Sequence, residues 1–397
     1  MKTAATPRPR TTGSTAVERI ISSSRRPKTL GAGKPGAISL AMGEPDSGTP
    51  AAVVEAAITA LSRGRTRYAP MAGSPELQHA LARHTTAKYG RLTMSEEIVL
   101  THGGSGGLAA TMLALVNPGD RILIPEPTYS LYADHAAMIG AEVIWVPNLA
   151  DGSLDLDTLR HEAATARMII LCNPGNPTGR VYPDSDLHRL EQLLQDNPNL
   201  LLLADEAYAD ITFDGGAFTS AMTLANVRDQ VICCSTFSKT YAMTGWRLGH
   251  VVAPAELASR INTIHRTLNG PLSTFIQDAA FTALQIPDAD LQAAALSYQQ
   301  RRDIVVEFLT GLPGVEMLTP QGAFYAFPRI TSSLTSDEMA ARFAEAGVLV
   351  RSGSEFGPSG EGHIRISFAT DVDSLKEGLV RFASTVRDMT RADARTN

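Results

Sequence analysis

Cysteine is scarce in this chain, which has only 3 among 397 residues. Cys172, Cys233 and Cys234 lie inside apolar runs, with no C-x-x-C pair and no histidine at the spacing of a zinc site. This pattern argues against a disulfide framework and against a cysteine–histidine metal centre, and it predicts reduced thiols in the core. We therefore expect a cytoplasmic protein that binds no metal.

The chain also lacks long apolar runs and an excess of basic residues. No run approaches the roughly 20 apolar residues of a transmembrane helix, and the N-terminus has no apolar segment of a secretory signal. A formal net charge of −6 argues against a nucleic-acid groove, which needs clustered Lys and Arg. Neither a membrane nor a nucleic acid is therefore an expected partner.

The first residues are basic and rich in Ser and Thr, with Glu18 as the only acid. The basic residues of this segment are Lys2, Arg8, Arg10, Arg19, Arg25, Arg26, Lys28 and Lys34. A transit peptide can have this composition. A flexible basic N-terminal arm over residues 1–35 is the simpler prediction.

From about Ala51 onward, helical patterns alternate with short apolar runs, which is typical of α/β architecture. Most of these runs are too continuously apolar for a half-exposed sheet, so we expect a mostly parallel sheet with helices on both faces. A helix is predicted after the N-cap Ser74, and another over residues 184–195. The predicted strands cover residues 121–125, 142–147, 168–172, 200–204, 231–235 and 248–252.

The pattern changes after about residue 288. A long helix through Arg301 precedes isolated strands at 322–327, 348–350 and 363–368, and Asp371 caps a final helix. This predicts a smaller α+β domain over residues 288–397. It accompanies a large domain over residues 36–287, whose first residues can pack on the smaller one.

A glycine-rich segment, THGGSGG at residues 101–107, opens a helical pattern after an apolar stretch. The backbone N–H groups of such a helix start favour a bound phosphate. The same letters satisfy the nucleophile elbow G-x-S-x-G with Ser105, and a loose dinucleotide fingerprint. A hydrolase would also need an acid and a late histidine, for which His250, His265 and His363 are candidates. A dinucleotide fold would place its loop nearer the start of the domain.

Lys239 follows the apolar run at 231–235, in the string STFSKTYAMTGWRLG. A lysine that leaves a buried strand near a cation, here Arg247, can hold an unprotonated amine and attack a carbonyl. A surface lysine in a turn is the alternative for this residue alone.

Asp205 ends a run of leucines, and burying its charge without a cation such as a pyridinium nitrogen would be costly. An N-cap or a salt bridge is its ordinary alternative. The turn NPGNPTG at 173–179 ends another strand. With the glycine-rich segment and Lys239, these motifs fall at the carboxyl ends of strands, where open α/β sheets bind ligands.

In this order, the motifs resemble those of the class I/II aminotransferases, pyridoxal 5'-phosphate enzymes of fold type I. The resemblance covers residues 43–368 and implies an aldimine between Lys239 and the cofactor. Asp205 would then pair with the ring nitrogen, and Asn176 and Tyr208 would bind the ring hydroxyl. Tyr129, in PEPTYSLY, would stack on the ring. The phosphate would be held by Gly104, Ser105, Thr236, Ser238 and Arg247.

The resemblance also concerns the substrate and the assembly. Arg365, in HIRISFA, would bind the α-carboxylate, with Asn176 beside it, since a guanidinium fork suits a carboxylate. Gly43 would close over the bound amino acid. Tyr68 would reach the phosphate in the neighbouring subunit, which implies a homodimer with shared active sites.

The implied reaction moves an amino group from an L-amino acid to a 2-oxo acid in a ping-pong mechanism, with Lys239 as base and then acid. Elimination, replacement and oxidation use the same residues and stay open as alternatives. A serine hydrolase through Ser105 and a non-catalytic regulator are more distant ones. Two positions depart from the family pattern, because Thr236 replaces the usual serine and Ser352 the usual proline. No second substrate arginine is evident beyond the candidate Arg266.

Overall fold

A seven-stranded sheet forms the centre of the molecule in the computed structural model, which describes residues 13–26, 34–216 and 218–396. All neighbouring strands run parallel except β8, which is antiparallel to both of its neighbours. In spatial order the strands are β2 (Ile98–Thr101), β8 (Gly249–Val252), β7 (Val231–Thr236), β6 (Leu201–Asp205), β5 (Ala166–Cys172), β3 (Arg121–Glu126) and β4 (Glu142–Pro147).

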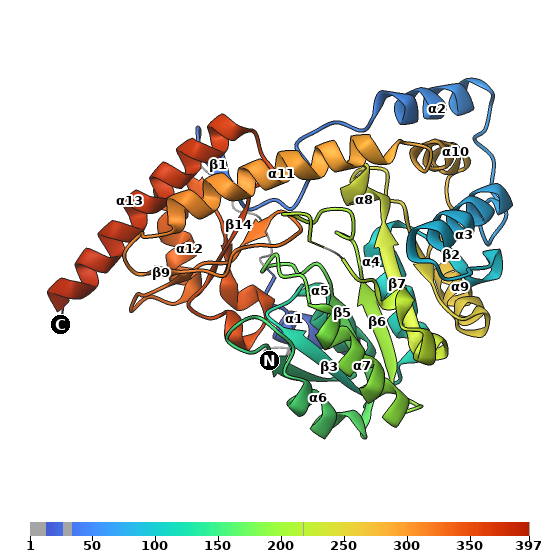
Figure 1. Ribbon diagram of the computed structural model, residues 1–397, viewed down its shortest axis with the longest axis horizontal. Helices are drawn as coiled ribbons and strands as arrows, with labels where there is room; N and C mark the ends of the chain where they lie inside the picture. The colour runs from blue at the N-terminus through green and yellow to red at the C-terminus, as the bar shows by residue number, and fades with distance from the viewer. Residues whose placement is uncertain (1–12, 27–33, 217, 397) are drawn as a thin grey trace, which may run out of the picture.

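Helices cover both faces of this sheet (Figure 1). Alternate strand residues point to opposite cores: Ile170 and Leu203 join one cluster, Ile169 and Leu202 another. The first core includes residues of α4 (Gly103–Leu115), α5 (Leu131–Ile139) and α9 (Ala255–Asn269). The opposite face packs against α3 (Pro75–Tyr89), α6 (Leu156–Ala163), α7 (Asp184–Asp196) and α10 (Thr274–Ala283), with α2 (Ala51–Ser62) lying outside α10.

The C-terminal region, residues 288–396, is a separate layer of small sheets and long helices. Figure 1 shows α11 (Asp288–Leu309) leading into it, with α13 (Val372–Thr396) packed against α11. Its remaining elements are β9 (Val315–Glu316), β10 (Tyr325–Ala326), β11 (Arg329–Ile330), α12 (Ser336–Glu345), β12 (Val348–Leu349), β13 (Arg351–Ser352), η4 (Gly353–Phe356), η5 (Pro358–Gly360) and β14 (Ile364–Ser367).

The strands of this region pair in three small sheets. The largest is antiparallel, in the order β10, β14, β13. β9 pairs with β11, and β12 pairs with β1 (Ile38–Ser39), which comes from the start of the chain. An early segment therefore packs on the C-terminal region.

The predicted elements are present. The six predicted strands match β3 to β8 to within two residues, and the apolar stretch before Thr101 is β2. Ser74 caps α3 by accepting a hydrogen bond from the Leu77 amide, and the Asp371 carboxylate accepts one from the Ser374 amide at the start of α13. The mostly parallel α/β architecture with a smaller α+β part is confirmed.

Within the predicted basic arm, the described part contains a helix, α1 (Thr15–Ser23). Arg19 ties it to the end of α5 by donating hydrogen bonds to the carbonyl oxygens of Ala137 (2.6 Å) and Met138 (3.0 Å). Lys2, Arg8, Arg10 and Lys28 lie outside the described residues. In the described part of the chain, no helix is both long and apolar enough to cross a membrane.

Candidate active site

A cavity of about 350 Å³ lies at the carboxyl ends of the parallel strands, next to the C-terminal region. The sheet topology brings together residues that follow β2, β3, β5, β6 and β7. Of the predicted site residues, the cavity is lined by Gly43, Gly104, Ser105, Tyr129, Asn176, Asp205, Tyr208, Thr236, Ser238, Lys239, Arg247 and Arg365.

Lys239 lies in the short helix α8 (Phe237–Thr240), which follows β7 directly. Its Nζ donates a hydrogen bond to the Gly43 carbonyl oxygen at 2.6 Å and is 5.8 Å from the centre of the Phe324 ring. Burial lowers the pKa of Lys239 to about 8, and the positive charges of Arg365 and Arg247 act in the same direction. A substantial fraction of this amine is therefore neutral near physiological pH.

Asp205 ends β6 and is buried beneath the cavity. Its Oδ2 accepts a hydrogen bond from the Tyr132 hydroxyl at 2.7 Å, and its Oδ1 accepts one from the Ala207 amide at 3.3 Å. Burial raises the pKa of Asp205, while these two hydrogen bonds oppose the shift. Among the described residues that line the cavity, Asp205 is the only acid. A cationic group above it would stabilise its charged form.

The N-terminus of α4 forms the anion-binding side of the cavity. The side chain of the N-cap residue His102 does not cap this helix, so amides of its first turn can donate hydrogen bonds to a ligand. Gly103 has φ +69°, and a Cβ there would lie 2.7 Å from Arg247 Nη2, so a glycine lets the arginine approach. Thr236 ends β7 nearby and Ser238 follows it, with their hydroxyls 2.9 Å apart. These donors suit a phosphate group.

Arg365 forms the opposite side of the cavity and is buried. Its Nη1 donates to Asn176 Oδ1 (3.1 Å) and its Nη2 to the Ala41 carbonyl oxygen (2.5 Å). Its buried Nε has no hydrogen-bond partner within the part of the chain that the structure describes. Among the described residues, no carboxylate lies within 4 Å of this guanidinium. A buried arginine without an anion is costly, so the site is prepared for a bound carboxylate.

Two tyrosines and a glycine shape the wall near Lys239. The hydroxyls of Tyr208 and Tyr325 are 2.8 Å apart. A Cβ on Gly43 would lie only 2.0 Å from the Tyr325 hydroxyl, so position 43 has no room for a side chain. Tyr129 packs edge-to-face on Tyr132, with ring centres 5.6 Å apart.

Sequence reasoning missed several residues that line this cavity or lie behind its wall. Tyr132 lies one helical turn after Tyr129, a spacing that could have placed it beside the same site. Arg26 lies 6.0 Å from the centre of the Tyr129 ring and 3.7 Å from an Asp134 oxygen. Arg351 lines the cavity too, but it is neutralised by Glu355, which accepts from its Nε at 2.8 Å. Tyr325 and both of these arginines carry no local sequence signal.

Three single positions answer questions that the motifs left open. Arg266 is exposed on α9 and does not line the cavity, so the structure does not support it as a second substrate arginine. The Ser352 hydroxyl lies 2.9 Å from that of Ser354, which donates to Asp337, so hydrogen bonds hold the loop that lacks the usual proline. Tyr68 is 93% exposed and lies outside the cavity of its own chain.

The hydrolase alternative is not supported by the positions of its histidines. His265 contacts His102 and His363 stacks on Phe327, while His250 is half-buried next to Phe237. Among the described residues, no histidine lines the cavity that contains Ser105. A serine–histidine pair is therefore not assembled here. The fold and the cavity instead define an α/β enzyme with a reactive amine, a buried acid and separate sites for two anionic groups.

Comparison with known proteins agrees with this class. Residues 35–382 match the family described as aminotransferase class I and II. The chain is 34% identical over 354 residues to the aspartate aminotransferase of Pyrococcus horikoshii, covering 87% of this chain and 89% of that protein. It is 34% identical over 349 residues to the arginine–pyruvate transaminase of Pseudomonas aeruginosa, covering 87% and 88%. The structure of the aromatic aminotransferase from Pyrococcus horikoshii OT3 matches with a TM-score of 0.87 at 32% identity, covering 94% and 99% of the chains.

The chain therefore belongs to the class I and II aminotransferase family and has the aspartate aminotransferase fold. It is an aminotransferase that uses pyridoxal 5'-phosphate, and its substrates are amino acids and 2-oxo acids. The residues of the cavity fit this cofactor. Among the described residues, no cation forms an ion pair with buried Asp205, and the start of α4 offers amides to a phosphate.

Proposed function

We propose that this enzyme transfers the amino group of an L-amino acid to a 2-oxo acid, with Lys239 as the group that moves the proton. The observation that carries the proposal is one cavity that contains a lysine of lowered pKa, a buried aspartate and a buried arginine without an anion. When bound, the cofactor accepts the electron pair released as the bond to the Cα proton breaks.

The cofactor is held, in this proposal, by groups from five strand ends. Asp205 pairs with the ring nitrogen, and Tyr132 keeps the Asp205 carboxylate in place. Asn176 and Tyr208 bind the ring hydroxyl, and Tyr129 stacks on the ring. The phosphate is bound by the Gly104 and Ser105 amides, Thr236, Ser238 and Arg247, all of which line the same cavity.

Arg365 binds the α-carboxylate of the amino acid in this scheme. Its orientation is set by Asn176 and by the Ala41 carbonyl, and its ring neighbours Tyr325 and Phe356 lie 4.5 and 5.0 Å away. A guanidinium held this way has donors left for one carboxylate. The amino acid is thereby oriented with its Cα near Lys239.

Lys239 then acts as general base and general acid. Its pKa of about 8 is close to the working pH, where a base can accept a proton and an acid can return it. The backbone carbonyl of Gly43 accepts a hydrogen bond from Nζ and so holds the amine at the cavity wall.

Covalent labelling tests the assignment of Lys239. The purified holoenzyme should be yellow, and borohydride reduction followed by peptide mass spectrometry should place the cofactor on Lys239. Label on any other lysine would contradict the assignment.

A single-turnover experiment distinguishes aminotransfer as the main reaction from elimination, replacement or oxidation. Holoenzyme mixed with one amino acid and no acceptor should form one equivalent of 2-oxo acid per site and then stop, with loss of the long-wavelength absorbance. Sustained release of ammonia without an acceptor would favour a lyase or an oxidase.

We also propose a homodimer with shared active sites. The support is Tyr68, which projects from its own chain and belongs to a part of the chain with other exposed apolar side chains, including Ile58, Leu61 and Met71. Mixing inactive Lys239→Ala chains with Tyr68→Ala chains should restore about a quarter of wild-type activity, because half of the dimers then contain one intact site. No restoration, or a monomer by light scattering, would contradict shared sites.

We also propose a division into two domains and a cytoplasmic location. The chain divides at about residue 288 into a large and a small domain, with β1 packed on the smaller one. A cytoplasmic location is supported by the three cysteines, which are free and buried.

A further inference from the structure

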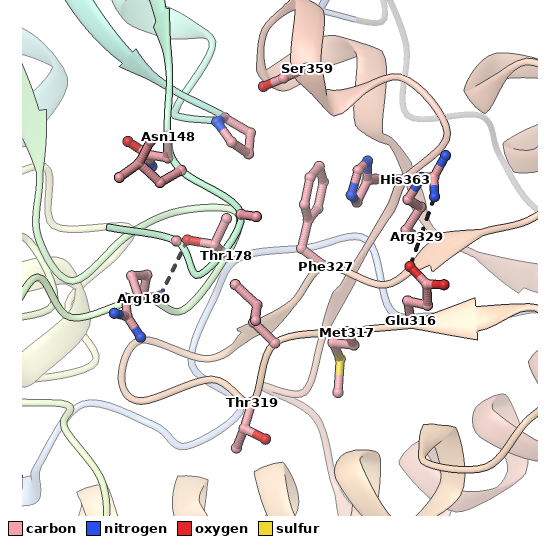
Figure 2. A pocket seen from close by; sticks show the side chains of 15 residues that line it. Asn148, Thr178, Arg180, Glu316, Met317, Thr319, Phe327, Arg329, Ser359 and His363 are labelled. Carbon is pink, nitrogen blue, oxygen red and sulfur yellow. Dashed lines mark hydrogen bonds and ion pairs between the residues drawn. The ribbon is translucent and has the colours of Figure 1, made fainter. Parts of the chain in front are cut away.

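A second cavity, of about 430 Å³, lies between the sheet region and the C-terminal region, apart from the cofactor cavity. The sheet region contributes the loop that follows β4 and the end of the turn that follows β5. The C-terminal region contributes β9, β11 and the segments beside them. Figure 2 shows Arg180 on one side of this cavity, and Arg329 with Glu316 on the other. None of its lining residues has a role in the proposed reaction.

Arg180 is the main unsatisfied charge of this cavity. Its Nη1 donates to Gln321 Oε1 at 2.9 Å, and its buried Nε finds no hydrogen-bond partner in residues 13–26, 34–216 and 218–396. Among the described residues, no carboxylate lies within 4 Å of its guanidinium. The positive charge of Arg180 helps to lower the pKa of Asp151, but the Asp151 carboxylate is exposed and accepts hydrogen bonds from Ser153. A partly buried arginine without an acid favours an anionic ligand.

The other charged groups of this cavity balance or screen one another, so the cavity can compensate one negative charge on a ligand. Arg329 Nη1 lies 3.8 Å from Glu316 Oε2. The two side chains are 59% and 76% exposed, so solvent screens this ion pair. Burial lowers the pKa of His363, which keeps its ring neutral at neutral pH. Arg180 is thus the one cation of this cavity, among the described residues, without a paired acid. A dianion such as a phosphate monoester would be only half compensated.

Apolar and flat side chains form a large part of the remaining lining, beside the polar side chains of Asn148, Thr178, Thr319 and Ser359. The rings of Phe327 and His363 lie face to face, with centres 4.8 Å apart and planes within 6° (Figure 2). Met317, Leu318 and Pro127 add aliphatic surface. Such a lining suits a planar or aromatic body, since ligand pockets of this size combine apolar walls with few polar groups.

The wall between the two cavities is formed by close backbone contacts. The Gly179 carbonyl accepts hydrogen bonds from the amides of Gln321 (2.8 Å) and Gly322 (2.9 Å). Asn176 faces the cofactor cavity, whereas Thr178 and Arg180 of the same turn line the second one. The two cavities are therefore adjacent but separate.

We propose that this second cavity is a binding site for a small organic monocarboxylate with an apolar or aromatic body, held by Arg180. The carboxylate would accept hydrogen bonds from the Arg180 guanidinium. The body would lie against Met317, Leu318 and Phe327.

The test is a titration of the holoenzyme with 3-(4-fluorophenyl)propionate, followed by ¹⁹F NMR. Saturable binding should weaken by at least about tenfold in Arg180→Gln, which loses the charged donor. Leu318→Trp, which fills the cavity and leaves its charge unchanged, should weaken binding as well. Acetate, which has no apolar body, should bind at least roughly tenfold more weakly.

Two matched variants serve as controls. Arg160→Gln removes an exposed arginine of α6 that pairs with Asp157, and it should leave binding unchanged. Arg365→Lys alters the proposed amino-acid site and should also leave binding of the probe to the second cavity unchanged. The proposal is overturned if no saturable binding occurs, or if Arg365→Lys abolishes binding while Arg180→Gln and Leu318→Trp retain it. In the latter case the probe occupies only the amino-acid site.

Discussion

The two cavities on either side of the turn at residues 173–180 each contain an arginine with an unpartnered Nε, but they are built differently. Arg365 is fully enclosed, and its fork is oriented by Asn176 and by a backbone carbonyl. Arg180 is held through one hydrogen bond to Gln321 and lies among loops. In the two proposals, the buried and oriented guanidinium binds the reacting substrate, whereas the less constrained one binds a ligand reversibly.

Replacing Lys239 should have the largest effect on turnover. It should affect only the cofactor cavity and not ligand binding in the second cavity. Lys239→Ala removes the group that carries the proton, so turnover should fall by at least about 10⁴-fold. Binding of the fluorinated carboxylate to the second cavity should stay unchanged. The measurements are steady-state turnover and the ¹⁹F titration, with Lys376→Ala on the exposed face of α13 as a matched control. Residual turnover within tenfold of wild type would contradict the role of Lys239.

Arg365→Lys should have the next largest effect, because it removes a bidentate donor from a buried site. We expect the catalytic efficiency for amino acids to fall by roughly 10²- to 10³-fold, mainly through KM. Half-reactions with primary amines that lack the carboxylate should change little, and this comparison is the internal control. Equal losses for amines and amino acids would show that Arg365 acts on something other than the carboxylate.

The pH dependence of cofactor capture tests the neutral state of Lys239. In the cofactor-free protein, its pKa of about 8 lies below the ordinary value of 10.5. The neutral fraction, and with it the capture rate, should rise about tenfold per pH unit below pH 8 and then level off. Stopped-flow absorbance between pH 6 and pH 10 measures this. A rate still rising steeply at pH 10 would show an unshifted lysine.

The same shift has a consequence for stability. Between pH 8 and pH 10.5 the unfolded chain holds the Lys239 proton while the folded protein has released it. The contribution of this group to the free energy of unfolding therefore increases with pH across that window and is constant below it.

Tyr132→Phe should have the smallest effect, since it removes one neutral donor and leaves Asp205 in place. Loss of this hydrogen bond to a charged group should reduce turnover by roughly tenfold. The pH at which the absorbance of the bound cofactor changes should shift as well, which a purely structural role would not produce. Tyr182→Phe, at a buried tyrosine that accepts from Asn148, is the matched control. An unchanged cofactor spectrum and an unchanged turnover rate would contradict the proposed role of Tyr132.

The cofactor cavity was largely predictable from sequence. Each of its motifs follows a strand run, and parallel strands bring their carboxyl ends to one edge, so Asn176, Asp205 and Lys239 had to lie near one another. Arg351 and Tyr325 were not predictable, because their places depend on how the C-terminal region packs on the sheet. The pairing of Arg351 with Glu355 is local, because the two residues are four apart in the chain, but the place of this pair at the cavity depends on the same packing.

The amino-acid sequence by itself determined the α/β class, the order of the strands along the chain and the motifs that contain the proposed site residues. These depend on local periodicity and on motifs a few residues long. Tertiary structure alone decided which charges stay unpaired. The lowered pKa of Lys239, the free Nε groups of Arg365 and Arg180, and the second cavity all result from burial and from contacts between distant segments. Desolvation depends on everything packed around a group, so no short stretch of sequence encodes it.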